Sequence, residues 1–189
     1  MFWRIKFRGI ENIPKDLKGG LLIAPNHQTY LDPVWVCLKV KRNLRFMAWD
    51  EAFSWFLIGR LIHYLGAFPV GFNRKDFIKA SRTALKALQE GATLVIFPEG
   101  EREFSDGRLL PFKAGAVRMA MDAEVPILPV TIRGGNRVWA QGMKFPRLGK
   151  VEIIYHPLIN IPKPVEDREI RSHIEKFNKK LIEIISSPL

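Results

Sequence analysis

The chain is organised around residues 26–33, Asn26-His27-Gln28-Thr29-Tyr30-Leu31-Asp32-Pro33, and around the apolar run directly before them, Leu21-Leu22-Ile23-Ala24. The apolar run predicts a short buried strand. Asp32-Pro33 predicts the start of a helix, because aspartate is favoured as an N-cap and proline at the first helical position. The stretch is therefore expected where a strand ends and a helix begins, which is where ligands bind in open α/β sheets.

The spacing of His27 and Asp32 limits how the two side chains can meet. Five positions on one helix turn through about 500°, so the two residues would not share a helix face. They converge only if His27 lies in the entry loop and Asp32 in the first helical turn. Asp32 could then hold one ring nitrogen of His27 and leave the other as a general base. The alternative interpretation is a helix cap beside an ordinary loop histidine.

Outward from this stretch, apolar runs alternate with amphipathic segments. Strands are expected at residues 2–10, 44–49, 67–70, 93–97, 125–132 and 150–156, and helices at residues 34–40, 51–65, 77–89, 113–122 and 164–186. The alternation predicts one α/β domain over residues 1–189, with a largely parallel or mixed central sheet flanked by helices. Pro126 and Pro129 predict that their strand is an edge or irregular one. Residues 134–149 are expected to form a loop.

The composition is strongly basic, with 30 Lys and Arg against 19 Asp and Glu and a net charge of +11. This balance indicates an anionic partner: a nucleic acid, a phosphorylated substrate or an acidic membrane surface. The single cysteine, Cys37, cannot form an internal disulfide, which indicates a reducing compartment. The N-terminus alternates apolar and basic residues and has no unbroken apolar core of a signal peptide.

The most apolar segment is residues 52–70, which Arg60 and His63 interrupt. It is too short and too polar at its centre for a transmembrane helix, which needs roughly 20 apolar residues. Two interpretations remain: a buried helix, or a helix lying partly in a membrane interface.

Charged residues follow several expected strands. Arg74 follows the strand at 67–70, while Arg102 and Lys113 follow the strand at 93–97. If the strands are parallel, their ends meet at one edge of the sheet, where Arg and Lys side chains could bind a phosphate. Glu99 is either a loop carboxylate or a group that orients a substrate hydroxyl or holds an arginine. The sequence contains no nucleophile elbow, no zinc motif and no glycine-rich nucleotide motif.

Four blocks of the sequence resemble, in order, those of the glycerolipid acyltransferases related to 1-acylglycerol-3-phosphate acyltransferase. The blocks are residues 26–32, residues 66–70 with Asn73-Arg74, Phe97-Pro98-Glu99-Gly100-Glu101-Arg102, and residues 125–130. The likeness runs from about residue 8 to about residue 157. The chain departs from the family at Glu101, where threonine or serine is common, and at Arg74, which lies two residues later than usual.

The resemblance implies a glycerol-3-phosphate acyltransferase-like fold and O-acyltransferase activity. The acyl group would come from acyl-CoA or acyl-carrier protein, and the expected acceptor is the free hydroxyl of 1-acylglycerol-3-phosphate, which gives phosphatidic acid. Another lysolipid or glycerol phosphate is the alternative acceptor. His27 and Asp32 would be catalytic, and the substrate-binding residues would be Arg74, Glu99, Gly100, Arg102 and Lys113. No metal and no cofactor besides the acyl donor is expected.

The expected location is the cytoplasmic face of a membrane, peripherally bound to an anionic surface, with no transmembrane helix. One rival hypothesis is a non-catalytic lipid- or membrane-binding module, which the basic surplus would serve equally well. A nucleic-acid binder is a second rival, suggested by the net charge and five tryptophans. Nucleic acid is not an expected partner, because the basic residues are spread over many elements and form no recognised binding motif.

Overall fold

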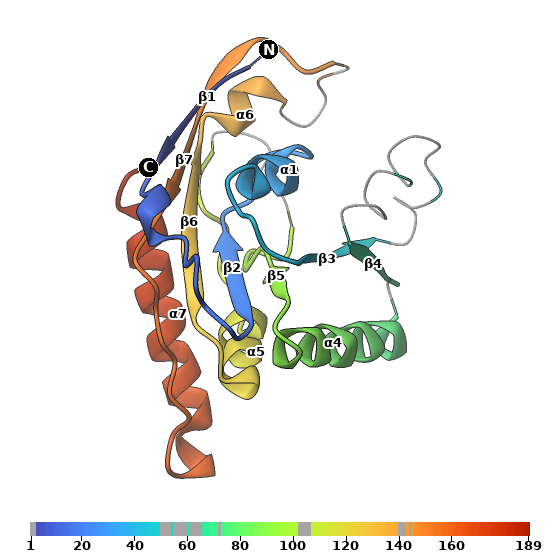
Figure 1. Cartoon of the computed structure of the whole chain (residues 1–189), viewed down its shortest axis with the longest axis vertical. Coiled ribbons are helices and arrows are strands. Elements are labelled where there is room, and N and C mark those ends of the chain that lie inside the picture. The colour runs from blue at the N-terminus through green and yellow to red at the C-terminus, as the bar shows by residue number, and fades with distance from the viewer. Residues whose placement is uncertain are drawn as a thin grey trace.

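The computed structural model describes residues 3–49, 54, 60, 66–71, 73–101, 107–139, 143 and 145–189. Its centre is a seven-stranded sheet in the order β1-β7-β6-β2-β5-β3-β4 (Figure 1). The strands are β1 (Trp3–Arg8), β2 (Leu21–Pro25), β3 (Leu44–Trp49), β4 (Ala67–Val70), β5 (Thr93–Val95), β6 (Ile127–Arg133) and β7 (Gly149–Tyr155). The helices are α1 (Asp32–Cys37), α4 (Arg74–Gln89), α5 (Gly115–Ala123), α6 (Gly135–Val138) and α7 (Ile170–Ser186), with 3-10 turns η1 (Ile10–Asn12) and η2 (Asp167–Glu169).

The sheet is mixed, which confirms the predicted fold class and decides between its two forms. Strands β6, β2, β5, β3 and β4 are parallel to one another. Strand β7 is antiparallel to β6, and β1 is parallel to β7. The carboxyl ends of the five parallel strands therefore lie at one edge of the sheet, with β2 in the interior.

Alternating residues of β2 pack into two separate cores. Leu21 and Ile23 join the core beneath α1, whereas Leu22 and Ala24 join the core beneath α4, α5 and α7. This follows from the two-residue period of a strand, since successive side chains point to opposite faces of the sheet. The sheet is thus covered on both faces, which explains why its central strands form continuous apolar runs.

The proline-containing strand is not an edge strand, so that form of the prediction is wrong. β6 lies between β7 and β2, and it is buried from Ile127 to Ile132. The carbonyl of Pro129 accepts a hydrogen bond from the His156 N–H at 3.0 Å. In a strand, the N–H and C=O of one residue point to the same side. Pro129 therefore lacks an N–H on the side that faces β7, and β7 pairing ends one residue away, at Val130.

Two further differences concern segment boundaries. α1 starts at Asp32 with Leu31 as its N-cap, so Asp32 is not the capping residue that the sequence predicted. The 134–149 segment, predicted as a loop, contains the short helix α6. The helix predicted at residues 51–65 falls almost entirely outside the described residues. Within the described part of the chain, no helix is both long enough and apolar enough to cross a membrane.

Candidate active site

The loop between β2 and α1 is anchored to the neighbouring strand by Asn26. Its buried side chain donates from Nδ2 to the Ile132 carbonyl at 3.1 Å, and its Oδ1 accepts the Ile132 N–H at 2.6 Å. These two bonds bridge 106 positions of sequence and satisfy the backbone of β6 where β2 has ended. The loop therefore leaves the sheet from a fixed point.

Asp32 determines the shape of this loop. The side chain is fully buried, and its Oδ2 accepts hydrogen bonds from the His27 Nδ1 at 2.9 Å and the Thr29 N–H at 2.7 Å. The same oxygen accepts the Gln28 N–H, and Oδ1 accepts the Thr29 hydroxyl at 2.9 Å. A buried carboxylate needs such partners to offset its lost hydration. All four donors precede α1, so Asp32 orients the loop rather than capping the helix.

The orientation of His27 follows from these contacts. Because Asp32 Oδ2 already accepts two backbone N–H groups, it acts as an acceptor, and His27 Nδ1 donates the proton between them. The other ring nitrogen, Nε2, then carries the lone pair of a base. The ring stacks on Phe97, with centroids 3.9 Å apart and 22° between the planes, and the side chain is 12% exposed. His27 is therefore fixed in both tautomer and ring plane.

Glu99 links the histidine loop to the segment after β5. Its Oε1 accepts the His27 N–H at 2.7 Å and its Oε2 accepts the Leu110 N–H at 2.7 Å. The residue is 1% exposed. Both oxygens are thus bonded to loop backbone, as expected for the loop carboxylate that was one of the sequence-based alternatives. Its predicted contact with substrate stays a prediction.

Gly100 and Lys113 lie against each other beside Glu99. Gly100 has a φ of +73°, and a Cβ at this position would lie 2.7 Å from the Lys113 Nζ and 2.9 Å from its Cδ. The Lys113 N–H also donates to the Pro98 carbonyl at 2.8 Å. The glycine therefore provides both a left-handed backbone and the space in which the lysine side chain crosses the turn.

The structure describes the side chain of neither predicted arginine, Arg74 or Arg102. Arg102 lies outside the described residues. Arg74 is the first residue of α4, which Asn73 caps by accepting the Asp76 N–H at 2.9 Å, and the position of the Arg74 side chain is not described. Their phosphate-binding roles remain predictions.

The sequence around this site matches a known family. The family model described as Acyltransferase matches residues 4–133, which is most of the chain. The chain belongs to the acyltransferase family.

Individual relatives are consistent with this assignment. The chain is 30% identical over 152 residues to a 1-acyl-sn-glycerol-3-phosphate acyltransferase from Bacillus subtilis, covering 79% of this chain and 71% of the relative. It is 28% identical over 176 residues to a chloroplastic enzyme of the same name from Arabidopsis thaliana, covering 92% of this chain and 49% of the relative. The chain spans about half the length of several of the curated relatives it matches.

A solved structure shows the same similarity in three dimensions. The acyltransferase-family chain superimposes on the 1-acyl-sn-glycerophosphate (LPA) acyltransferase PlsC from Thermotoga maritima with a TM-score of 0.74 and 28% sequence identity. The match covers 98% of this chain and 74% of that one. The likeness therefore extends beyond residues 4–133 to nearly the whole acyltransferase-family chain.

Sequence reasoning missed the part that Gln28 plays in this acyltransferase-family site. Gln28 is buried, its Oε1 accepts the Gly135 N–H at 2.9 Å and its Nε2 donates to the Gly107 carbonyl at 3.2 Å. One side chain thereby connects α6, the β2–α1 loop and the segment after Glu99. The only signal in the sequence was a polar residue next to the histidine, which does not reveal partners about 80 and 107 positions away.

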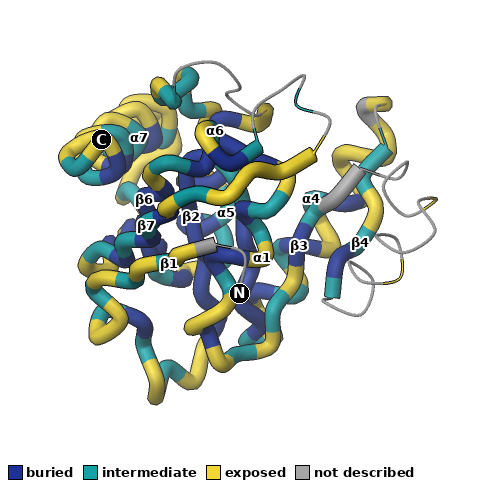
Figure 2. The backbone as a smooth tube through the Cα atoms, turned by 90° about the horizontal axis from the view of Figure 1, so that it is seen from above, coloured by how far each residue is buried: buried dark blue, intermediate teal, exposed yellow. Residues whose placement is uncertain are grey.

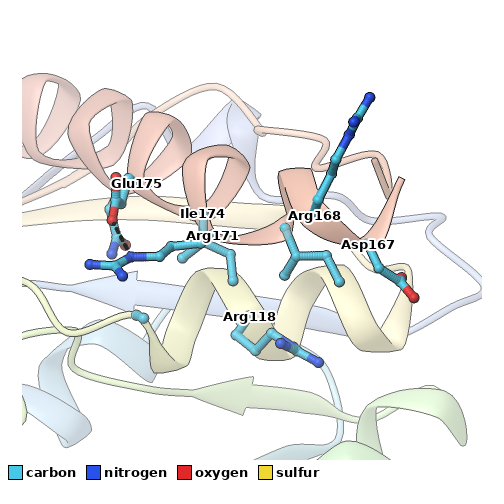
Figure 3. A pocket seen from close by; sticks show the side chains of 9 residues that line it. Arg118, Asp167, Arg168, Arg171, Ile174 and Glu175 are labelled. Carbon is cyan, nitrogen blue, oxygen red and sulfur yellow. Dashed lines mark hydrogen bonds and ion pairs between the residues drawn. The ribbon is translucent and has the colours of Figure 1, made fainter. Parts of the chain in front are cut away.

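The depression between α5 and α7 lies apart from the candidate site (Figure 3). Its volume is about 480 Å³, and none of the predicted site residues lines it. Arg118 pairs with Asp122 at 2.8 Å and Arg171 with Glu175 at 3.1 Å, so its guanidinium charges already have acidic partners. In the described part of the chain, no three His, Cys, Asp or Glu residues group as metal ligands would.

Proposed function

We propose that this protein transfers a fatty acyl group from acyl-CoA or acyl-carrier protein to the free hydroxyl of 1-acylglycerol-3-phosphate. The products are phosphatidic acid and the free thiol. The observation that carries the proposal is the 2.9 Å contact between His27 Nδ1 and the buried Asp32, in a chain of the acyltransferase family. The printed names of the relatives support the choice of acceptor.

The reaction needs no protein nucleophile. Nε2 of His27 removes the proton of the acceptor hydroxyl as that oxygen attacks the thioester carbonyl, and Asp32 stabilises the imidazolium that forms. The tetrahedral intermediate expels the thiolate, which takes the proton back from His27 and leaves as a thiol. General-base assistance of this kind contributes about 10²–10⁴-fold to the rate, and the fixed position of the ring adds to it.

The acceptor phosphate is proposed to bind near Lys113, whose ammonium group lies over Gly100 on the Glu99 turn. Lysine contacts phosphate as a compact point charge, and arginines bind its oxygens in a bidentate manner. Arg74 and Arg102 are the proposed arginine partners. Glu99 and Gly100 would contribute by shaping this side of the site, the first through the His27 backbone and the second through the space it leaves.

The decisive experiment is an acyl-transfer assay with purified protein. Acyl-CoA and acyl-carrier protein are each combined with lysophosphatidate, glycerol 3-phosphate, lysophosphatidylglycerol and a lyso-ornithine lipid. Thiol release gives the rate and mass spectrometry identifies the product. We expect phosphatidic acid as the main product and its loss in His27→Ala. If the folded protein binds lysolipid but releases no thiol with any pair, it is a non-catalytic lipid-binding module.

A further inference from the structure

The segment from Arg133 to Lys150 is strongly basic. It contains five basic residues, Arg133, Arg137, Lys144, Arg147 and Lys150, and no acidic residue. Residues 33–49 are a second stretch of this kind, with four basic residues and no acidic one. A stretch of this kind attracts an anionic surface.

Hydrogen bonds hold the described residues on either side of Phe145 in this segment. The Arg147 N–H donates to the Val138 carbonyl at 2.8 Å, which closes the loop onto the end of α6. The indole Nε1–H of Trp139 donates to the Met143 carbonyl at 3.1 Å. The Trp139 ring in turn contacts Tyr30 of the β2–α1 loop, with ring centroids 5.4 Å apart. Residues 145–148 are thus attached to the rest of the fold.

Two large apolar side chains among residues 145–148 nevertheless face solvent. Phe145 is 73% exposed and Leu148 is 76% exposed, and among the large apolar residues that the structure describes only Val165 is more exposed. Hydrophobic side chains held in water by a fixed backbone favour transfer into an apolar phase. We call Phe145 and Leu148 the apolar tip.

A second set of basic side chains adjoins the apolar tip. Arg4 on β1 is paired in register with Lys150 on β7, and both residues are exposed. Further along, the single acid Glu152 forms ion pairs with Lys6, Arg8 and Arg133, at distances from 2.6 to 3.9 Å. Three cations against one carboxylate leave this surface positively charged. Figure 1 shows α1, α6 and the N-terminus at the same end of the sheet, the end seen from above in Figure 2.

We propose that the apolar tip and the basic side chains of Arg4, Arg137 and Lys150 dock this protein on the surface of an anionic lipid bilayer. Phe145 and Leu148 would enter the boundary between head groups and acyl chains, while the cations contact lipid phosphates. This combination of inserted apolar residues with surrounding Lys and Arg is what interfacial membrane binding requires.

A bilayer suits this surface better than a nucleic acid does. Phosphate contacts would use the same cations, but a nucleic acid offers no apolar layer for an exposed leucine and favours stacking on aromatic rings instead. Docking at this place also orients the β2–α1 loop, because Gln28 is bonded to Gly135 of α6 and Tyr30 contacts Trp139. The benefit for catalysis, delivery of a membrane-embedded acceptor to His27, rests on the proposed function; the docking itself does not.

The test is vesicle flotation of the full chain without any substrate. Neutral phosphatidylcholine vesicles are compared with vesicles that also contain phosphatidylglycerol. The tip variant is Phe145→Ser with Leu148→Ser, and the charge variant is Arg137→Gln with Lys150→Gln. The matched controls are Val165→Ser with Leu158→Ser, which removes exposed apolar residues elsewhere, and Lys75→Gln with Lys79→Gln, which removes exposed charges of α4. Circular dichroism confirms that each variant is folded.

We expect wild-type protein to bind the anionic vesicles and the tip variant to bind at least about tenfold more weakly, given the transfer free energy of two large side chains. The charge variant should lose about tenfold or more on anionic vesicles only, and both controls should bind like wild type. Wild-type affinity in the tip variant, or equal losses in the controls, would overturn the proposal. Binding is scored without turnover, so an inactive protein that still floats contradicts the proposed function alone.

Discussion

Two loops at the same edge of the sheet differ in which side chains they bury and which they expose. The β2–α1 loop buries its polar groups and gives each of them a partner: Asp32 accepts four hydrogen bonds, and Asn26 and Gln28 bond to distant backbone. In the loop before β7, the Arg147 N–H is bonded to the Val138 carbonyl, but the side chains of Phe145 and Leu148 lie in water. The first arrangement fixes the ring of His27. The second leaves surface available for a partner.

The comparison teaches that order and burial are separate properties of a loop. Both loops are held by specific hydrogen bonds, yet only the first is protected from solvent. A change in the buried loop should alter chemistry and stability together, because its polar groups would lose partners that water cannot replace. A change in the exposed loop should alter binding to a surface and leave stability nearly unchanged.

The largest expected effect comes from Asp32→Asn in the buried loop. An asparagine side chain keeps an acceptor for the Gln28 and Thr29 N–H groups but no longer stabilises an imidazolium at His27. We expect the rate of thiol release to fall by about 10²–10⁴-fold. Thermal unfolding followed by circular dichroism should still show a cooperative transition. Full activity in a folded Asp32→Asn protein would contradict the catalytic role of the pair.

Glu99→Gln separates the two roles that the sequence allowed for this carboxylate. One amide oxygen can still accept a backbone N–H, but the amide nitrogen then faces a second donor, from His27 or Leu110. Urea denaturation should show a loss of about 1–3 kcal/mol in the free energy of unfolding. Steady-state assays should show a lower kcat, since the His27 backbone shifts. A rise in KM for the acceptor with unchanged stability would instead support direct substrate contact.

Gly100→Ala should have a smaller effect at the rim of the buried loop. A left-handed backbone costs an alanine about 1–2 kcal/mol, and its Cβ would displace the Lys113 side chain. We expect the free energy of unfolding to fall by that amount and KM for lysophosphatidate to rise. Adding Lys113→Ala removes the contact but not the backbone strain. If the double variant regained full stability, the cost would come from crowding alone.

The smallest effect concerns pH and comes from outside both loops. Burial lowers the pKa of His156, whose Nε2–H donates to the Thr131 hydroxyl at 2.8 Å. Lys180 and Glu183 of α7 line the same depression. Because the folded pKa lies below the unfolded value of about 6.5, the unfolded chain binds the proton first, and stability falls as pH drops below that value.

His156→Gln should flatten this pH dependence in urea denaturation at a series of pH values. The same variant should leave the pH dependence of thiol release unchanged, since His156 follows β7 and is not part of the His27 loop. A shift of the activity profile in His156→Gln would show that the two histidines are coupled.

Local sequence signals predicted the local parts of this fold well. The run 21–24 and the dipeptide Asp32-Pro33 predicted the strand-to-helix junction, and the structure has both β2 and α1 there. The five-residue spacing predicted that His27 and Asp32 meet across the junction, and they do, at 2.9 Å. These predictions succeeded because propensity and spacing act over a few residues.

The failures concern strand order, which local sequence does not contain. Pro129 indicated an edge strand, but its missing donor falls beyond the end of β7, which only the pairing register reveals. The carboxyl ends of the parallel strands do lie at one edge, but they are not equally close to β2. β4 is three strands from β2, so its carboxyl end lies about 14 Å away at about 4.8 Å per strand. Arg74 therefore starts α4 three strands away from β2, and its phosphate-binding role stays a prediction.

The bonds of Asn26 to Ile132 have a consequence for how the protein is made. The β2–α1 loop is encoded in eight consecutive residues, but the anchor of Asn26 lies 106 positions downstream and the Gly135 contact of Gln28 lies 107 positions downstream. Long-range contacts of this kind form late, because the entropy of closing the chain must be overcome first. A nascent chain that ends before Ile127 carries His27 and Asp32 without the strand that anchors their loop. The β2–α1 loop therefore acquires its shape only when β6 pairs with β2.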